Sequence, residues 1–249
     1  SAFKEAGYKT YYVTYLNKIH IGDNAINQLV AEADVYLKGD LSLDNLEDIA
    51  GAYDVLRILK EPEEKKLIVF KLIGSHYNFH ERYDDRFNKF TPSHLDVRYS
   101  GPKLEEKHLL ENSYDNSILV TDYAVDLIIE GLSKIDGRSS LSFISDHGIS
   151  IFDIESSPYG GPTRSNYNIP LFFWFKDGYF SSEKLSNLQN NSDTSIDSTC
   201  FLDTFFTLHD LETSKKKGCD LASGVIAPYL RKVIVKDQMV DYDLFFDDK

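Results

Sequence analysis

The sequence predicts an α/β fold built around a mostly parallel sheet. Two short runs of consecutive apolar residues, Leu67–Phe70 and Leu141–Ile144, are typical of strands buried on both faces. Segments with apolar residues at helical spacing alternate with such strands along the chain. Ser145-Asp146-His147-Gly148 directly follows the second run, and Gly74-Ser75-His76 comes shortly after the first. Open α/β sheets place their ligand sites at these strand ends.

The N-terminal quarter is predicted to alternate between helix and strand. Phe3–Gly7 is typical of a helix end, with its glycine as the C-terminal stop. The aromatic and β-branched run Lys9–Tyr15 predicts a strand. Apolar residues at helical spacing predict a helix over residues 24–38. The acidic segment Asp40–Asp48 predicts a loop that leads into a helix ending near residue 59.

The remainder of the chain contains the clearest helical pattern, over residues 112–132, with apolar side chains on one stripe. Residues 169–175 predict a strand with a proline near its start, where a missing N–H donor is tolerated. Residues 186–198 are rich in Asn, Ser and Asp and predict a surface loop. Residues 196–210 predict a helix, and residues 231–243 alternate like a hairpin.

Composition limits the possible functions. The 249 residues, 42% of them hydrophobic, suffice for one large domain, residues 1–249, with a sizeable core. A net charge of −13 argues against a nucleic-acid partner, because phosphate contacts need clustered lysine and arginine. The apolar run Leu171–Phe175 is too short to span a bilayer. No signal-peptide pattern opens the sequence.

The chain has two cysteines, Cys200 and Cys219. They permit one disulfide bond, and two buried free thiols are an equally good interpretation of the sequence. Two cysteines are too few for a structural zinc site made of thiolates.

Asp146 and His147 are the residues that best fit a metal site. A carboxylate supplies charge, an imidazole is a common zinc ligand, and the strand before them fixes their direction. Gly148 lets the backbone turn away from the metal. His76 follows another strand, so we expect it to open onto the same crevice. Taken alone, His76 would be a turn histidine bonded to backbone groups.

Six segments occur in an order and spacing that resemble the periplasmic catalytic domain of the phosphoethanolamine transferases that modify lipid A and the lipopolysaccharide core. These enzymes belong to the sulfatase and alkaline-phosphatase superfamily. The resemblance covers nearly the whole chain, and its most specific part is Tyr114–Tyr123. The six segments are Gly74–His76, Glu81–Tyr83, Phe87–Phe90, Tyr114–Tyr123, Ser145–Gly148 and Pro170–Trp174.

The resemblance implies an α/β/α sandwich of the alkaline-phosphatase type, monomeric and held at the periplasmic face of the bacterial inner membrane by an upstream anchor. Such enzymes move phosphoethanolamine from phosphatidylethanolamine onto a threonine and then onto a lipopolysaccharide sugar. Zinc would be held by a glutamate, the nucleophilic threonine, Asp146 and His147. His76 would contact the phosphate or a second zinc ion.

The chain departs from the family pattern at several positions. The nucleophilic threonine and the glutamate ligand are expected upstream of Ser1. Ile149 stands where the family usually has glutamate, and Lys71 where it often has histidine. Tyr159 replaces a histidine and would occupy the second phosphate-binding position, because a phenol bonds phosphate but is a poor zinc ligand.

Three interpretations of these departures remain open. The chain is part of a membrane-anchored transferase and is inactive by itself. Alternatively, it belongs to a sulfatase or phosphodiesterase of the same superfamily, although the sequence has no Cys/Ser-x-Pro-x-Arg motif. Finally, it is a paralogue that binds phosphate head groups without turnover, which the changes at Ile149 and Tyr159 favour.

Overall fold

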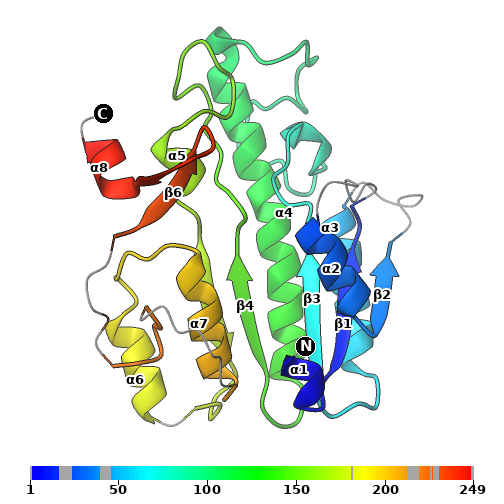
Figure 1. The fold of residues 1–249 in the computed structure, drawn as a ribbon. Coiled ribbons are helices and arrows are strands. Elements are labelled where there is room, and N and C mark those ends of the chain that lie inside the picture. Colours follow the sequence, from blue (N-terminus) through cyan, green and yellow to red (C-terminus); the bar gives the residue numbers. More distant parts are fainter. Residues whose placement is uncertain are drawn as a thin grey trace. The chain divides into compact units, whose positions relative to one another are not determined.

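The computed structural model describes residues 2–16, 24–39, 46–180, 182–211, 219–224, 226 and 230–247. The chain divides into two compact units (Figure 1). Unit 1 comprises Ser1–Gly137 with Ile154–Pro158, and unit 2 comprises Arg138–Asp153 with Tyr159–Lys249. In these described ranges, no helix combines the length and the apolar character needed to cross a membrane. The single domain expected from the sequence stays a prediction.

Unit 1 contains a parallel three-stranded sheet in the order β2-β1-β3, which confirms the predicted strand direction. β1 is Lys9–Thr14, β2 is Val35–Lys38 and β3 is Lys66–Lys71. The central strand carries the best-buried side chains, because it is paired on both edges and covered on both faces. Tyr11 and Val13 are at most 1% exposed.

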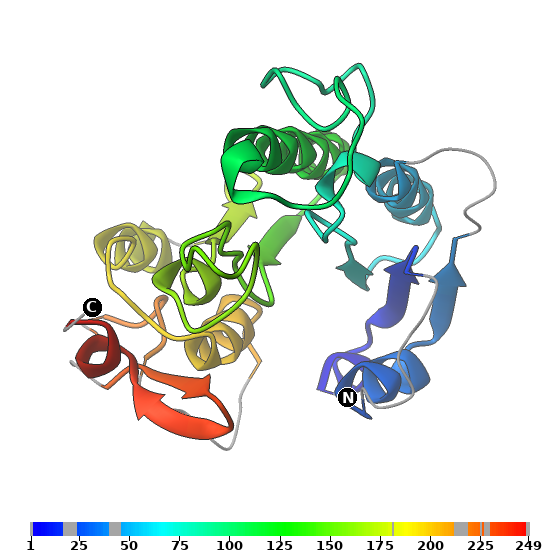
Figure 2. The same ribbon diagram turned by 90° about the horizontal axis from the view of Figure 1, so that it is seen from above.

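Helices flank this sheet. α1 is Ala2–Glu5, α2 is Asn24–Glu32, α3 is Glu47–Leu59 and α4 is Lys107–Ser133. Seen from above, α2 lies on one face of the sheet and α3 on the other (Figure 2). Unit 1 is therefore layered as helix, sheet and helix, as the resemblance implied.

Two glycines allow α3 to approach its neighbours. A Cβ atom at Gly51 would lie 2.5 Å from the ring of Phe70 on β3. On α4, a Cβ atom at Gly131 would lie 2.2 Å from the side chain of Leu56. Real Cβ atoms do not come this close, so a larger residue at either position would require the Phe70 ring or the Leu56 side chain to shift.

The helix predicted over residues 24–38 is wrong in its second half, because α2 ends at Glu32 and β2 follows. Asp34 lies between them, and its Oδ2 accepts hydrogen bonds from the N–H and the hydroxyl of Thr10, at 2.9 and 2.8 Å. These bonds hold the chain against β1, where residues 35–38 gain a strand partner. Gly7 ends α1 at φ +82°, as predicted.

The Tyr114–Tyr123 segment lies on α4, which begins at Lys107, earlier than the predicted residue 112. Within it, Asn116 is fully buried and uses all its hydrogen-bonding capacity. Its Oδ1 accepts the N–H groups of Lys89 and Phe90, both at 2.9 Å. Its Nδ2 donates to Asn88 Oδ1 at 3.0 Å and to the Phe90 carbonyl at 2.9 Å. The motif therefore anchors the loop that carries Phe87–Phe90.

The loop between β3 and α4 also holds a histidine cluster. His94 is 4% exposed, and its ring lies 4.7 Å from that of Tyr99 and 6.1 Å from that of His80, measured between ring centroids. Neither ring nitrogen of His94 has a hydrogen-bond partner among the described residues. Burial lowers the pKa of His94, and the nearby His80 lowers it further. The neutral imidazole is thus the form that this packing accepts.

Acidification from about pH 7 to about pH 5 is expected to destabilise unit 1 through His94. Its folded-state pKa lies below its ordinary value of 6.5, so its contribution to stability is present above pH 6.5 and is lost as the pH falls. Through this one group, the free energy of unfolding can fall by at most about 1.4 kcal/mol per pH unit. The free energy of unfolding, measured with urea across this pH range, should fall less steeply for His94→Phe than for the wild-type chain, because phenylalanine cannot titrate. Parallel losses in the two proteins would contradict the prediction.

Unit 2 contains β4, Ser140–Ile144, and β5, Leu171–Phe175, as predicted from the apolar runs. They run antiparallel, an exception to the expected parallel arrangement, and Phe143 pairs with Phe172. A parallel connection needs a crossover of a dozen or more residues that is usually helical. The segment between these strands instead contains the four-residue helix α5, Arg164–Tyr167, and returns the chain alongside β4.

The C-terminal part of unit 2 is mainly helical. The helix predicted over residues 196–210 is α7, Thr199–Leu208, and its Phe201 stacks on Phe173 of β5 with ring centroids 6.1 Å apart. The surface loop predicted over residues 186–198 is wrong for residues 186–190, which are helical and belong to α6 (Ser182–Asn190). The predicted hairpin is confirmed by two paired strands and is followed by a short helix. These elements are β6, Lys232–Val235, β7, Gln238–Asp241, and α8, Tyr242–Asp247.

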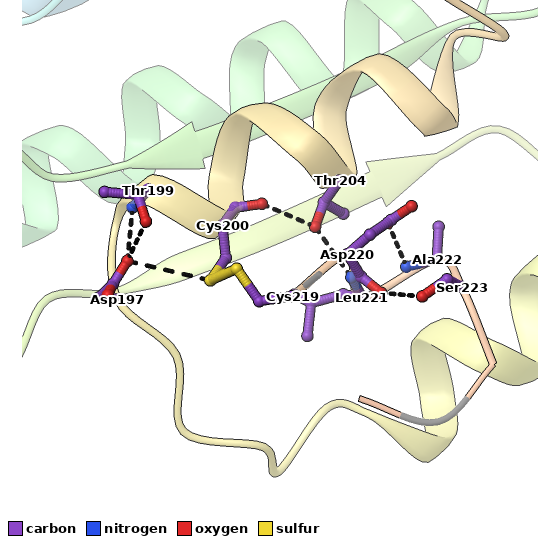
Figure 3. The surroundings of a disulfide bond; sticks show 9 residues. All are labelled: Asp197, Thr199, Cys200, Thr204, Cys219, Asp220, Leu221, Ala222 and Ser223. Atoms are coloured by element: carbon purple, nitrogen blue, oxygen red, sulfur yellow. Dashed lines mark hydrogen bonds between the residues drawn. A yellow bond between two sulfur atoms is a disulfide. The ribbon is translucent and has the colours of Figure 1, made fainter. Parts of the chain in front are cut away.

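Cys200 and Cys219 form a disulfide bond, which decides between the two interpretations that the sequence allowed (Figure 3). Cys200 lies in the first turn of α7. One turn later, the Thr204 hydroxyl donates to the Cys200 carbonyl and accepts the N–H of Leu221, both at 3.0 Å. The covalent bond and this hydroxyl together attach the segment around Cys219 to α7.

Candidate functional site

His76 lies in unit 1, in the turn that follows β3. The turn passes through Gly74, whose φ of +61° suits a residue without a side chain. His76 is exposed. Its Nδ1 lies 2.6 Å from the Tyr77 carbonyl oxygen, which can only accept, so Nδ1 carries the proton. In the neutral ring, Nε2 is then the atom with a free lone pair.

Two side chains that the sequence analysis missed hold this turn. Asp48, in the first turn of α3, is 5% exposed and accepts the N–H of Ile73 at 2.7 Å and that of Gly74 at 2.8 Å. Burial raises the pKa of Asp48, while these two hydrogen bonds act in the opposite direction. Arg82 donates from Nε to the His76 carbonyl at 3.2 Å.

Asp146 and His147 lie in unit 2, directly after β4, and both are exposed. The His147 N–H donates to Asp146 Oδ1 at 3.1 Å. His147 Nδ1 lies 2.7 Å from the Gly148 carbonyl oxygen, so this nitrogen donates and Nε2 keeps its lone pair. Histidines that ligate metals commonly have this arrangement, with the other ring N–H donated to a backbone carbonyl.

Gly148 is required here by a close approach. A Cβ atom at this position would lie 2.0 Å from the Ser165 carbonyl oxygen of α5. The Gly148 N–H also donates to the Asn166 carbonyl at 2.9 Å. The turn after His147 therefore packs directly against α5, which gives the predicted sharp turn a steric reason.

Tyr159 is 44% exposed and precedes Gly160, whose φ is +83°. Its loop is tied to the turn after His147 by two side chains that the sequence analysis also missed. The Ser150 hydroxyl donates to the Gly160 carbonyl at 2.9 Å. Asn166 accepts the Ser150 N–H at 3.0 Å and donates from Nδ2 to the Gly161 carbonyl. The segments bearing Asp146, His147 and Tyr159 are thus joined within unit 2.

The donor set of this turn fits part of a zinc site. A carboxylate and an imidazole with its Nδ1 proton already bonded are both accessible at Asp146 and His147. Among the described residues, no three or more His, Cys, Asp or Glu side chains are grouped so that they could hold a metal. His76 belongs to unit 1 and Asp146 and His147 to unit 2, so their convergence stays a prediction.

Most of the chain matches the model of a known protein family. The Sulfatase family model matches residues 1–210, most of the 249-residue chain. The chain belongs to the sulfatase family. The matched range includes every candidate site residue of this family member, from His76 to Tyr159.

Individual relatives indicate which kind of sulfatase-family enzyme the chain is similar to. Phosphoethanolamine transferase EptC of Escherichia coli O18:K1:H7 (strain RS218 / NMEC) is 26% identical over 261 residues, which cover 96% of this chain and 43% of the relative. This sulfatase-family chain thus spans less than half the length of that curated relative. The similarity confirms the resemblance to phosphoethanolamine transferases that the sequence motifs indicated.

Solved structures confirm the fold. The crystal structure of the C-terminal periplasmic domain of EcEptC from Escherichia coli matches with a TM-score of 0.80 at 21% identity, covering 99% of this chain and 72% of that one. The zinc complex of the same domain matches with a TM-score of 0.74 at 22% identity, covering 97% and 70%. At this level of identity the likeness concerns the fold. This sulfatase-family chain therefore has the sulfatase-like α/β fold that its motifs implied.

Proposed function

We propose that the protein containing this chain transfers phosphoethanolamine from phosphatidylethanolamine to lipopolysaccharide, at a lipid A or core sugar. The observation that carries the proposal is the Asp146-His147 turn, whose imidazole is fixed with Nε2 available for a metal. The similarity to EptC over 96% of the chain supports the choice of a transferase over other sulfatase-family reactions. The Tyr114–Tyr123 motif, which anchors the Phe87–Phe90 loop, supports it further.

Asp146 and His147 are proposed to hold zinc together with a glutamate and the nucleophilic threonine from a segment upstream of Ser1. A bound zinc ion lowers the pKa of the attacking hydroxyl and stabilises negative charge on the transferring phosphoryl group. His147 is oriented for this role by the Gly148 carbonyl, and His76 by the Tyr77 carbonyl. His76 is proposed to contact the phosphate, and the Tyr159 hydroxyl is proposed as a further phosphate contact.

The proposed protein is a monomer anchored in the bacterial inner membrane, with this domain at the periplasmic face. The location of the similar EcEptC domain, which is periplasmic, supports this proposal. A net charge of −13 disfavours nucleic acid as a partner.

The decisive assay uses the full-length protein in liposomes that contain phosphatidylethanolamine labelled in its ethanolamine, with lipopolysaccharide as acceptor. Label that moves to lipopolysaccharide supports the proposal. Label released as free phosphoethanolamine would instead favour a hydrolase of the same family. Binding of the labelled lipid without either product would favour a binding paralogue, as the changes at Ile149 and Tyr159 suggest.

The 249-residue chain by itself is expected to give no labelled lipopolysaccharide in the same assay, because the proposed nucleophile and one metal ligand lie outside it. The full-length protein at equal concentration is the control. Turnover by the 249-residue chain would contradict the placement of the nucleophile upstream of Ser1.

A further inference from the structure

The candidate phosphate contact, His76, is exposed, yet the turn that carries it is held by buried groups. Asp48 lies on α3, 25 residues before Ile73 in the sequence. Its two carboxylate oxygens accept hydrogen bonds from two consecutive N–H groups, at 2.7 and 2.8 Å. These belong to Ile73 and Gly74, the residues at which the chain leaves β3 and changes direction. His76 follows two residues later.

We propose that Asp48 is a positioning residue for His76, which fixes the turn after β3 so that the imidazole bonds the Tyr77 carbonyl and presents Nε2 outward. The role of Nε2 towards phosphate rests on the proposed function. The positioning itself rests only on contacts within unit 1. Asp48 touches the turn and not the phosphate, so it acts through His76.

Carboxylate chemistry explains why this position suits aspartate. An ionised carboxylate accepts at both oxygens, and here each oxygen accepts one N–H. The single oxygen of Asn116 accepts two N–H groups, but at Asp48 the two N–H groups face different oxygens. With asparagine in this placement, one N–H would face the amide nitrogen, which is itself a donor. The carboxylate therefore bonds both peptide groups in this arrangement, with one oxygen for each N–H.

The opposite side of the turn is held by Arg82, which follows the short 3₁₀ helix Phe79–Glu81. Its guanidinium donates to the His76 carbonyl at 3.2 Å and lies 4.0 Å from Glu47, the neighbour of Asp48 on α3. A small pocket between these groups is lined in part by Asp48, Gly74 and Arg82. The backbone is thus bonded before and at His76, and its imidazole has one hydrogen-bonded orientation.

Burial of a carboxylate argues for a role beyond stability. Removing Asp48 from water disfavours its charge and raises its pKa. A neutral, apolar contact between α3 and the turn would avoid that cost but would leave the two N–H groups free to move. The buried carboxyl group of Asp48 therefore lies where it fixes the path of the backbone, beside an exposed histidine.

The test is the tautomer of His76, measured by two-dimensional ¹H–¹⁵N NMR on the 249-residue chain labelled at histidine, with the His76 signal assigned from its loss in His76→Gln. In the wild-type chain the neutral ring should carry its proton on Nδ1. In Asp48→Asn the turn is released, and a mixture with the Nε2–H form is expected. Asp54→Asn is the matched control, since Asp54 lies on α3 and instead accepts the Tyr15 hydroxyl at 2.9 Å.

Asp48→Ser provides a second variant in case the asparagine amide prevents folding, because serine has no N–H group to oppose the turn. Retention of a pure Nδ1–H tautomer in either folded variant would overturn the proposal, as would an equal change in Asp54→Asn. A tautomer mixture confined to the Asp48 variants supports it.

Activity of the full-length protein separates this proposal from the proposed function. Asp48→Asn should lower transfer roughly 10- to 100-fold, the range found when supporting groups behind a ligand are removed, whereas Asp54→Asn should not. Unchanged transfer in Asp48→Asn would count against the positioning role. If the wild-type protein transfers nothing while the tautomer changes as expected, the proposed function fails and the positioning by Asp48 stands.

Discussion

Replacing Asp146 by alanine in the full-length protein is expected to reduce phosphoethanolamine transfer at least about 100-fold and to remove bound zinc. Asp146 supplies the only carboxylate in the turn after β4, and its loss leaves His147 without the charge that neutralises the metal. Asp146 is exposed, so the fold should tolerate the change. Transfer rate and zinc content per mole of protein are the two measurements.

Asp153→Ala is the matched control for this experiment. Asp153 is exposed and lies on the same segment, past the buried Ile151 and Phe152. Its removal changes the net charge equally but should leave both zinc content and transfer at wild-type values. Full zinc content in Asp146→Ala would contradict the assignment of Asp146 as a ligand.

The double variant Cys200→Ser, Cys219→Ser is expected to lower the free energy of unfolding by about 3 kcal/mol, the value for closing a loop of this length. The bond spans 19 residues and attaches the Cys219 segment to α7. Its loss gives the unfolded chain more freedom and leaves the Thr204 hydroxyl as a remaining link between the two segments. Urea unfolding followed by tryptophan fluorescence measures the change, because Trp174 lies on β5 of the same unit.

Reductant provides the control for this second result. Dithiothreitol should destabilise the wild-type chain by a similar amount and should not affect the double variant, which has no disulfide to reduce. Equal stability of the oxidised wild-type chain and the double variant would show that the bond is absent in solution or has no effect on unfolding.

Elements whose signal is local could be predicted from the sequence, as β3 and β4 were from their apolar runs. β2 was missed because Leu37 continues the helical spacing set by Val30 and Ala33. The helix ends there because Asp34 accepts hydrogen bonds from Thr10, which lies 24 residues earlier in the sequence. In the structure, the side chains of Val35–Lys38 alternate between half-buried and exposed, as is common in an edge strand.

Strand direction in unit 2 was missed for a similar reason. Apolar runs do not encode direction, which depends on what connects the strands. The turn at Gly148 packs against α5, so the connection between β4 and β5 folds back on itself instead of forming a crossover helix. A search for helical spacing across residues 145–170 would have found none long enough for a parallel connection.

The chemistry of the candidate site could be proposed from sequence because the Asp146-His147 pair is contiguous. Its supporting groups could not, since Asp48, Ser150 and Asn166 act through bonds to distant backbone atoms. Asp48 in particular belongs to a segment that the sequence analysis assigned to an acidic loop. A buried carboxylate bonded to residues 25 positions away has no local signature.

The most direct measurement is the intact mass of the full-length protein purified from membranes in the presence of phosphatidylethanolamine, followed by peptide mapping. We predict an added mass of one phosphoethanolamine group on a threonine upstream of Ser1, present in the wild-type protein and lost in Asp146→Ala. A wild-type protein with neither the adduct nor bound zinc would contradict the transferase assignment and would favour the binding paralogue instead.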